Sequence, residues 1–308
     1  MWFWLSLITL LCWSGSDLFS KIGCVDESDK YSHLKMVMAV GTVMGLHAAY
    51  EVFVGGTVIN LEIILTYLPV SLLYIGSMAM GYLGLRYIEL SISSPICNSS
   101  GALVAVLTLL FVGSEDYGPL ALAAVALVCA GAIGLGVVDF LEDDELRAQR
   151  QELGNRKYAK SFLALALPVA YCILDAAGTF ADNRVLETLS HVVEDYEASA
   201  NVAYELTFLA AGVLCFIYTV IIKKDKLVPK MEAPKYIGAI FETAGQFAYI
   251  YAIADTEHLA MSAPIISAYC AASVLWSRIF LKEKLSWKHY SMIGLVLVGI
   301  VIMGVLDL

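Results

Sequence analysis

Apolar residues dominate this chain in stretches of about twenty residues, which short polar segments separate. An α-helix needs roughly 20 residues to cross the hydrocarbon of a bilayer. Open strands would leave backbone groups without hydrogen bonds in lipid, so each stretch is expected to be a helix. The pattern predicts an all-α membrane protein with ten transmembrane helices, at residues 2–22, 33–54, 63–85, 92–112, 120–138, 161–180, 198–222, 235–254, 259–281 and 287–306.

The second half of the chain repeats the first. Five residues recur 169 positions later: Gly76, Ala79, Tyr82, Leu90 and Pro95 correspond to Gly245, Ala248, Tyr251, Leu259 and Pro264. At an offset of 168, Glu115, Leu127, Gly131 and Gly136 correspond to Glu283, Leu295, Gly299 and Gly304. We therefore expect a first five-helix repeat at residues 1–139, a charged cytoplasmic linker at 140–160 and a second five-helix repeat at 161–308.

An odd number of helices per repeat has a geometric consequence. The second repeat begins on the opposite side of the membrane, so the two repeats are expected to be inverted, related by a pseudo-twofold axis in the membrane plane. Inverted repeats around a site near the midplane allow a transporter to open to either side.

Composition agrees with a membrane protein. The chain is 59% hydrophobic and 16% charged, whereas soluble domains are roughly 45–50% apolar and about 25% charged. Its seven cysteines form no C-x-x-C pair, so no disulfide framework or metal site is indicated. We expect no cofactor.

Basic residues predict the orientation. When the loops are assigned alternately to two sides, one side receives all but one of the 19 Lys and Arg residues, the exception being Arg184. The positive-inside rule makes the basic side cytoplasmic, so both termini are expected outside. The outer loops carry eleven acids, Asp182 among them, and this charge would attract cations.

The end of the chain resembles a known family. Ser262-Ala-Pro264, the segment from Leu281 to Ser286 (LKEKLS), Gly294 and Gly299 are similar to the closing helices of EamA-type drug/metabolite transporters with ten helices. The resemblance implies a bacterial or archaeal inner-membrane carrier, multi-pass, that moves small metabolites or drugs, often in exchange for protons. Members of the family usually keep both termini in the cytoplasm, and the charge count predicts a departure from that.

Acidic residues inside the predicted spans are the first candidates for function. An ionisable residue at the centre of a span costs at least ~2.5–3.5 kcal/mol on insertion, so it is functional by default. Five acids qualify, namely Asp17, Glu51, Asp175, Glu205 and Glu242. The nearest bases, Lys21 and Arg86, lie at helix ends, from which they can reach the headgroups.

Glu242 lies nearest the middle of a span. Gln246 and Tyr249 follow it at i+4 and i+7, which makes one polar face with an aromatic edge. Burial disfavours the charged form of such a carboxylate, so Glu242 is expected to be neutral until a cation or proton competes for it. The alternative is a neutral Glu that only hydrogen-bonds a neighbouring helix.

Asp17 and Asp175 occupy corresponding positions in the two repeats. Each follows an aromatic residue by one turn, Trp13 and Tyr171 respectively. The arrangement resembles that of small multidrug resistance proteins, in which paired carboxylates of the first helix bind cation and proton in turn. These acids can equally lie close enough to helix ends to stay solvated.

His47 and Glu51 share one face of the second span, and Glu205 lies about two turns into the seventh. Two ligands without a third are poor evidence for a metal. A proton relay or a plain hydrogen bond between helices is expected for His47, and Glu205 is expected either to line an outer vestibule or to sit at headgroup level.

Helices four and nine open with proline and add polar side chains. Asn98 and Ser267 correspond at offset 169, each three residues past its proline, and Tyr269 follows. Small polar residues here would let a substrate approach, although they also serve helix packing. With Trp13, Tyr171 and Tyr249, Tyr269 supplies rings for cation–π contacts.

These features predict a carrier. A channel would need a continuous polar lining or a carbonyl filter, and a membrane enzyme would need a nucleophile, base or metal constellation that the sequence lacks. Acids without bases, beside aromatic rings, favour proton-coupled antiport of a small organic cation. A neutral or zwitterionic metabolite such as an amino acid, with the acids serving protons only, is the alternative. We expect Glu242, Gln246, Tyr249, Asn98, Ser267, Tyr269, Tyr171 and Trp13 to bind substrate, and Glu242, Asp175, Asp17, Glu205 and His47 to couple protons.

The charge count generates a test of orientation. A fluorescent protein that matures only in the cytoplasm, fused after Leu308, is expected to stay dark in intact cells, whereas a periplasm-active enzyme at the same point is expected to be active. A bright fusion would place the termini inside.

Overall fold

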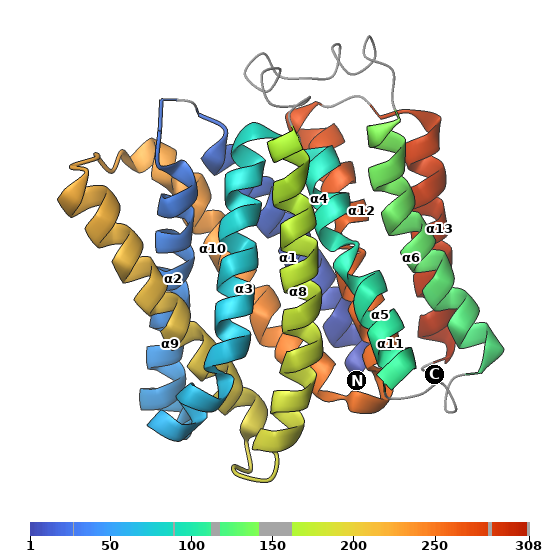
Figure 1. The fold of residues 1–308 in the computed structure, drawn as a ribbon, viewed down its shortest axis with the longest axis horizontal. Coiled ribbons are helices and arrows are strands. Elements are labelled where there is room, and N and C mark those ends of the chain that lie inside the picture. The colour runs from blue at the N-terminus through green and yellow to red at the C-terminus, as the bar shows by residue number, and fades with distance from the viewer. Residues whose placement is uncertain (27, 89, 112–117, 142–161, 283–284, 307–308) are drawn as a thin grey trace.

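The computed structural model describes residues 1–26, 28–88, 90–111, 118–141, 162–282 and 285–306. These residues form helices and short connections, without a strand among them (Figure 1). The first half contains α1 (Trp2–Cys24), α2 (Ser32–Tyr50), η1 (Glu51–Gly55), α3 (Leu61–Tyr87), α4 (Leu90–Asn98), α5 (Ser100–Phe111) and α6 (Pro119–Phe140). The second contains α8 (Phe162–Leu189), α9 (Tyr196–Phe216), η3 (Ile217–Ile222), α10 (Pro229–Ala254), η4 (Thr256–His258), α11 (Leu259–Ser267), α12 (Tyr269–Trp276), η5 (Ser277–Leu281) and α13 (Trp287–Leu306).

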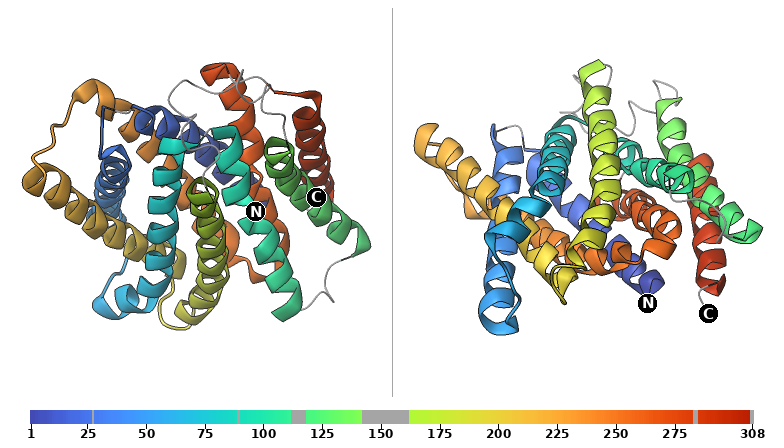
Figure 2. Two further views of the ribbon diagram at one scale, coloured as in Figure 1. Left: turned by 45° about the horizontal axis from the view of Figure 1, so that its top comes forward. Right: turned by 60° about the horizontal axis from the view of Figure 1, so that its bottom comes forward.

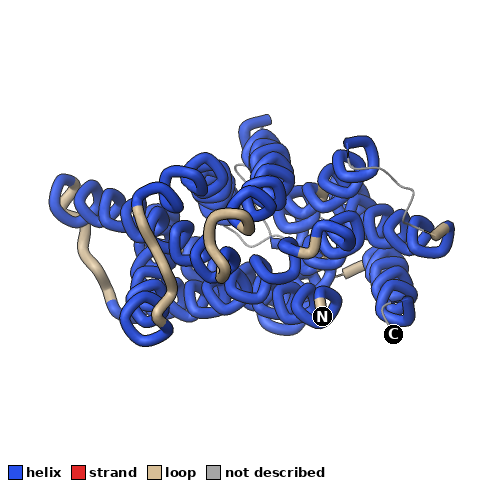
Figure 3. Tube along the Cα trace, turned by 90° about the horizontal axis from the view of Figure 1, so that it is seen from below, coloured by secondary structure: helices blue, strands red, loops and turns tan. Residues whose placement is uncertain are grey.

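The bundle has two outer pairs and a central group. Helices α2 and α9 pack at one end and α6 and α13 at the other, with α1, α3, α8 and α10 between them (Figures 1 and 2). The view along the helices shows the same elongated arrangement (Figure 3). The all-helical fold predicted from the sequence is confirmed for the described residues.

Eight of these helical segments are long and apolar enough to cross a membrane, and α8 and α10 are not among them. Both carry charged residues within their length, including Asp175 on α8 and Glu242 on α10. Two of the three acids that line the central cavity thus lie on these two helices. The predicted linker 140–160 and the corresponding residues Glu115 and Glu283 lie outside the described residues.

Helix α8 is longer than the sequence predicted. We expected the span to end at residue 180 and placed Asp182 in an outer loop, because residues 181–189 are polar. The helix continues to Leu189. Its buried face includes Asp182, Asn183 and Leu186, while Arg184 and Glu187 are exposed. The amphipathic period of 3.6 residues, and not mean hydropathy, keeps this segment helical.

Two helices are broken near the middle of the bundle. Between α4 and α5 the break is at Ser99, and between α11 and α12 it is at Ala268, which is 169 residues further on. Each break follows a proline by four residues, Pro95 and Pro264 respectively. Proline removes one backbone donor and crowds the preceding turn, which favours such interruptions.

A cluster of paired charges closes one edge of the bundle. Asp29, in the connection between α1 and α2, accepts from Lys35 at 2.9 Å and from Lys235 at 3.0 Å, and all three side chains are buried. Glu232 lies 3.1 Å from Lys235, and Asp225 lies 3.0 Å from Lys35. These pairs join α2, α10 and two connections. The described termini and this cluster lie at opposite edges (Figure 1).

Lys21 differs from the sequence-based expectation. It does not extend toward the headgroups but is buried, and its ammonium donates to the carbonyl oxygens of Leu85 at 3.1 Å and Ile88 at 2.9 Å. These carbonyls belong to the C-terminal end of α3, where unsatisfied acceptors and the helix dipole favour a cation. Arg86 likewise turns inward, donating to Ser32 at 2.9 Å.

Close helix contacts at two glycines generate a stability test. A Cβ on Gly131 would lie 2.6 Å from Val296 Cγ2, and a Cβ on Gly299 would lie 2.6 Å from Val128 Cγ2. We expect Gly131→Ala and Gly299→Ala each to destabilise the protein by ~1–3 kcal/mol, since the α6–α13 interface must move apart. Thermal unfolding in detergent measures this. Gly294→Ala is the control, because nothing lies within 4 Å of its Cβ; equal effects at all three positions would contradict the prediction.

The charge cluster generates a pH test. Burial alone would raise the pKa of Asp29, but hydrogen bonds and charge from Lys35 and Lys235 outweigh it and hold the pKa below its usual value. A carboxyl whose pKa is lowered by folding stabilises the protein above its unfolded value of about 3.9, and this is lost as pH falls. Asp29→Asn is expected to cost about 3 kcal/mol at neutral pH and to flatten the loss of stability in acid. Glu62→Gln, at an exposed acid near the start of α3, should do neither.

Candidate functional site

A cavity lies at the centre of the bundle, among α1, α3, α8, α10 and the two broken helices. It holds about 920 Å³ of empty space, the part open to solvent included. None of the described residues that line it is Lys, Arg or His. The outer pair α6 and α13 contributes no lining residue among those described.

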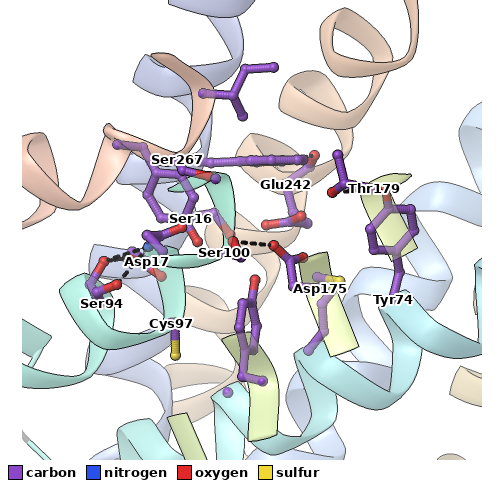
Figure 4. Close-up of a pocket in the computed structure, with 18 of the residues that line it drawn as sticks. Ser16, Asp17, Tyr74, Ser94, Cys97, Ser100, Asp175, Thr179, Glu242 and Ser267 are labelled. Carbon is purple, nitrogen blue, oxygen red and sulfur yellow. Dashed lines mark hydrogen bonds between the residues drawn. The ribbon is translucent and has the colours of Figure 1, made fainter. Parts of the chain in front are cut away.

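Three carboxylates from three helices face this space. Asp17 comes from α1, Asp175 from α8 and Glu242 from α10 (Figure 4). Ser273 donates to Asp17 at 2.9 Å, and Ser100 donates to Asp175 at 2.7 Å. Like charges that share a site of low dielectric oppose one another's ionisation. The cavity therefore gathers three acids whose ionisation is mutually unfavourable.

Aromatic rings form a second part of the lining. The rings of Trp13 and Tyr249 lie with centroids 4.9 Å apart, and Tyr269 meets Trp13 edge-on at 5.9 Å. Tyr171 lines the same cavity. Ring faces bind organic cations through the quadrupole, with more benefit when the site excludes water.

Glycines hold these rings in place. A Cβ on Gly245 would lie 2.4 Å from Trp13 Cδ1, so only glycine lets the indole lie against α10. The indole Nε1 then reaches the Glu242 carbonyl oxygen at 3.4 Å. A Cβ on Gly81 would lie 2.9 Å from the Tyr171 ring. The aromatic rings are therefore positioned by their close approach to the backbone of a neighbouring helix, and not by side-chain chemistry alone.

The broken helices bring further polar groups to the cavity. Asn98 and Ser100 flank the break of α4 and α5, and Ser267 and Tyr269 flank that of α11 and α12. Asn98 Nδ2 donates to the Ser94 carbonyl oxygen at 2.8 Å, so it also satisfies the backbone near the break. Interrupted helices of this kind place backbone and polar groups at mid-membrane.

Three lining groups have no hydrogen-bond partner within the described structure. Ser20 Oγ, Gln246 Nε2 and the hydroxyl of Tyr82 are all buried and unpaired. A buried donor without a partner costs about 1–3 kcal/mol. Each is therefore available to a bound molecule.

The structure brings together all eight residues that we expected to bind substrate, and Asp17 and Asp175 with them. Their roles stay predictions. Sequence reasoning missed Tyr74 and Tyr82 on α3, Tyr204 on α9 and Thr179 on α8 as lining residues. The spacing of Thr179, at i+4 from Asp175, was the available signal for the last of these.

Glu205 and His47 do not line the cavity. They form a separate hydrogen bond between α9 and α2, with His47 Nδ1 2.8 Å from Glu205 Oε1. Glu51 lies 3.8 Å from the other ring nitrogen, and Asn201 donates to Glu205 at 3.2 Å. The Glu205 side chain is fully buried between helices, and its expected position at an outer vestibule or at headgroup level stays a prediction. Within the described ranges no group of three His, Cys, Asp or Glu is arranged to hold a metal ion.

The fold and cavity define the class: an all-helical membrane protein with a central polar cavity. Residues 189–305 match the model of the EamA-like transporter family, which confirms the resemblance to that family predicted from the sequence. The match indicates a membrane transporter of the drug/metabolite kind.

One solved structure, described only as "Crystal structure of protein", is similar over 99% of this chain and 96% of its own, with a TM-score of 0.62 and 14% identity. At that identity the likeness shows the fold alone. No match was found among curated proteins.

Proposed function

We propose that this protein is a proton-coupled secondary transporter that carries a small organic cation across the inner membrane by alternating access. One observation carries the proposal: Asp17, Asp175 and Glu242 line a single cavity in which no described residue is basic. Acids buried without a base are neutralised by what enters, and protons and organic cations are the two candidates. Competition between them for the same carboxylates is the minimal chemistry of antiport.

The ring lining supports a cationic substrate. Trp13 contacts both Tyr249 and Tyr269, and all three rings line the cavity. Acids supply long-range attraction, and the rings supply a hydrophobic surface that still favours positive charge. An organic ammonium ion fits both requirements, whereas an inorganic cation would make no use of the rings.

Alternating access is supported by helix contacts that recur between corresponding residues of the two halves of the chain. Gly131 meets Val296, and the corresponding Gly299 meets Val128, each pair being related by the offset of 168. The packing of α1 against α10 likewise corresponds to the packing of α8 against α3. Figure 1 shows α1 rising from the lower edge and α8 descending toward it. These features fit ten spans arranged as two inverted repeats, with the boundaries predicted from the sequence.

The proposed orientation follows the basic residues. The α1–α2 connection, the end of α3 and the start of α10 lie at one edge of the bundle, and the ends marked N and C lie at the opposite edge (Figure 1). The first three segments carry Lys30, Arg86 and Lys230 respectively. The basic edge would be cytoplasmic and both termini extracytoplasmic.

A zwitterionic metabolite such as an amino acid is the second candidate, and one observation favours it. The unpaired donors Gln246 Nε2 and Tyr82 hydroxyl could bind a carboxylate or carbonyl oxygen. The three acids would then bind the ammonium group or serve protons only. The two candidates differ in whether the bound molecule must carry a net positive charge.

Three probes with one phenyl ring separate the candidates. Phenethylamine is cationic, phenylalanine zwitterionic and 2-phenylethanol neutral at neutral pH. A bound molecule stabilises the state it binds, so thermal shift of the purified protein ranks them. Preference for phenethylamine supports a cation carrier, preference for phenylalanine supports the second candidate, and no shift with any probe counts against both.

Glu242→Gln tests the role of the central acid. The substitution keeps size and hydrogen bonding but removes titration. We expect wild type in detergent to release protons when phenethylamine binds, and Glu242→Gln to release fewer and bind at least about tenfold more weakly, ~1.4 kcal/mol. Glu62→Gln, at an exposed acid near the start of α3, is the matched control and should resemble wild type. Equal proton release by Glu242→Gln and wild type would make Glu242 structural.

A further inference from the structure

Helix α8 carries a polar stripe that leaves the cavity. Asp175, Thr179 and Asp182 follow one another at i, i+4 and i+7, which places them on one face of the helix. At 1.5 Å per residue, Asp182 lies about 10 Å further along the axis than Asp175. Asp175 and Thr179 line the cavity, and Asp182 does not. The stripe runs toward the edge of the bundle at which Arg184 and Glu187 are exposed.

Asp182 is fully buried and is held by hydroxyl groups alone. Tyr67 donates to Oδ1 at 2.6 Å and Tyr74 donates to Oδ2 at 3.2 Å, both from α3. The other titratable groups that face it are Tyr249 of α10 and Tyr204 of α9. No cation among the described residues forms an ion pair with it, since the basic residue of this segment, Arg184, pairs with Glu187. A carboxyl in this setting has no fixed charge to hold it ionised.

A short chain of hydroxyls joins Asp182 to the cavity. Tyr74 bonds to Asp182 and also to Tyr249. Thr179 accepts from Tyr74 at 3.2 Å and from Tyr249 at 3.1 Å. Tyr74, Thr179 and Tyr249 all line the cavity, as Figure 4 shows for Tyr74 and Thr179. Asp182 is thus one hydroxyl away from the cavity, whereas Tyr67, which also bonds to Asp182, is not one of the residues that line it.

We propose that Asp182 is a second proton-binding site, which exchanges its proton with the cavity through the hydroxyls of Tyr74, Thr179 and Tyr249. The proposal rests on the proposed function and adds a site for the coupling ion. When Asp182 gives up its proton, Tyr74 accepts it and passes its own to the next hydroxyl. Each hydroxyl gains one O–H bond and loses one, so the relay is left neutral and the proton reaches the cavity, where Asp175 can accept it.

A purely structural Asp182 would behave differently. It would keep one protonation state and only fasten α8 to α3 through Tyr67 and Tyr74. Infrared difference spectra of the purified protein, titrated from about pH 4 to 9, follow the carbonyl stretch of protonated carboxyl groups directly. We expect Asp182→Asn to lose one titrating band that wild type shows. Glu187→Gln, at an exposed acid of the same helix, is the control and should keep it. An unchanged set of bands in Asp182→Asn would overturn the proposal.

The route of exchange is tested by two matched variants that leave Asp182 in place. Tyr74→Phe and Tyr67→Phe each remove one hydroxyl donor to the same carboxyl, but only Tyr74 lines the cavity. After transfer into D₂O, the deuterium shift of the Asp182 band reports the rate of proton exchange. We expect Tyr74→Phe to slow exchange by about tenfold or more and Tyr67→Phe to leave it near the wild-type rate. Slowing by Tyr67→Phe alone would place the route on the other side and overturn the relay.

These measurements need no substrate, so the proton site can be contradicted without contradicting the proposed function, and the reverse. A wild type that shows the Asp182 band and cavity-dependent exchange, yet binds none of the three phenyl probes, would overturn the cation carrier and support the proton site. A wild type that binds phenethylamine with proton release, yet shows no Asp182 band, would overturn the proton site alone.

Discussion

The free energy of placing carboxylates away from water governs the centre of this molecule. Transfer of an ionised carboxylate into an apolar interior costs several kcal/mol unless a partner compensates it. Asp17 and Asp175 have serine donors and Glu242 lines the same cavity, and no described base lies there. The acids therefore require surrounding helices that enclose them while leaving a space for protons or a cation. Helices α8 and α10, which carry Asp175 and Glu242, lie between the outer helix pairs of the bundle.

The same constraint is met in a different way elsewhere in the protein. At the basic edge, Asp29 is buried against two lysines, which satisfies its charge and ties the start of α2 to α10. On α8, Asp182 is satisfied by tyrosine hydroxyls. Paired charges resist separation, whereas an acid held by neutral donors can accept a proton without breaking an ion pair. Asp29 and Asp182 thus differ in how readily each can change its charge.

Helix geometry makes the cavity possible. Broken helices at Ser99 and Ala268 bring polar side chains to mid-bundle, and glycines at close contacts let large rings approach the backbone of a neighbouring helix. Packing in a membrane protein depends on such small residues, because lipid tails provide no hydrophobic force between helices. The correspondence of breaks and glycine contacts across the repeat shows that one packing solution is used twice.

Much of this organisation could be predicted from local sequence. Apolar stretches of membrane length predict helices, and the acids Asp17, Asp175 and Glu242 stand out because each interrupts such a stretch. The offset of 169 residues predicts which positions correspond, Ser99 and Ala268 among them. The hydropathy pattern wrongly predicted a loop at residues 181–189. Packing against other helices keeps this polar segment helical and buries Asp182.

Only the tertiary structure decided which acids share a space. Glu205 and Glu242 look alike in sequence, yet Glu205 pairs with His47 between α9 and α2 while Glu242 faces the cavity. It likewise decided that Lys21 caps α3 and that Tyr74 connects Asp182 to the lining. These outcomes depend on the rotation and partners of each helix. Periodicity along a single helix defines its faces, but the neighbours that each face meets are set by long-range packing.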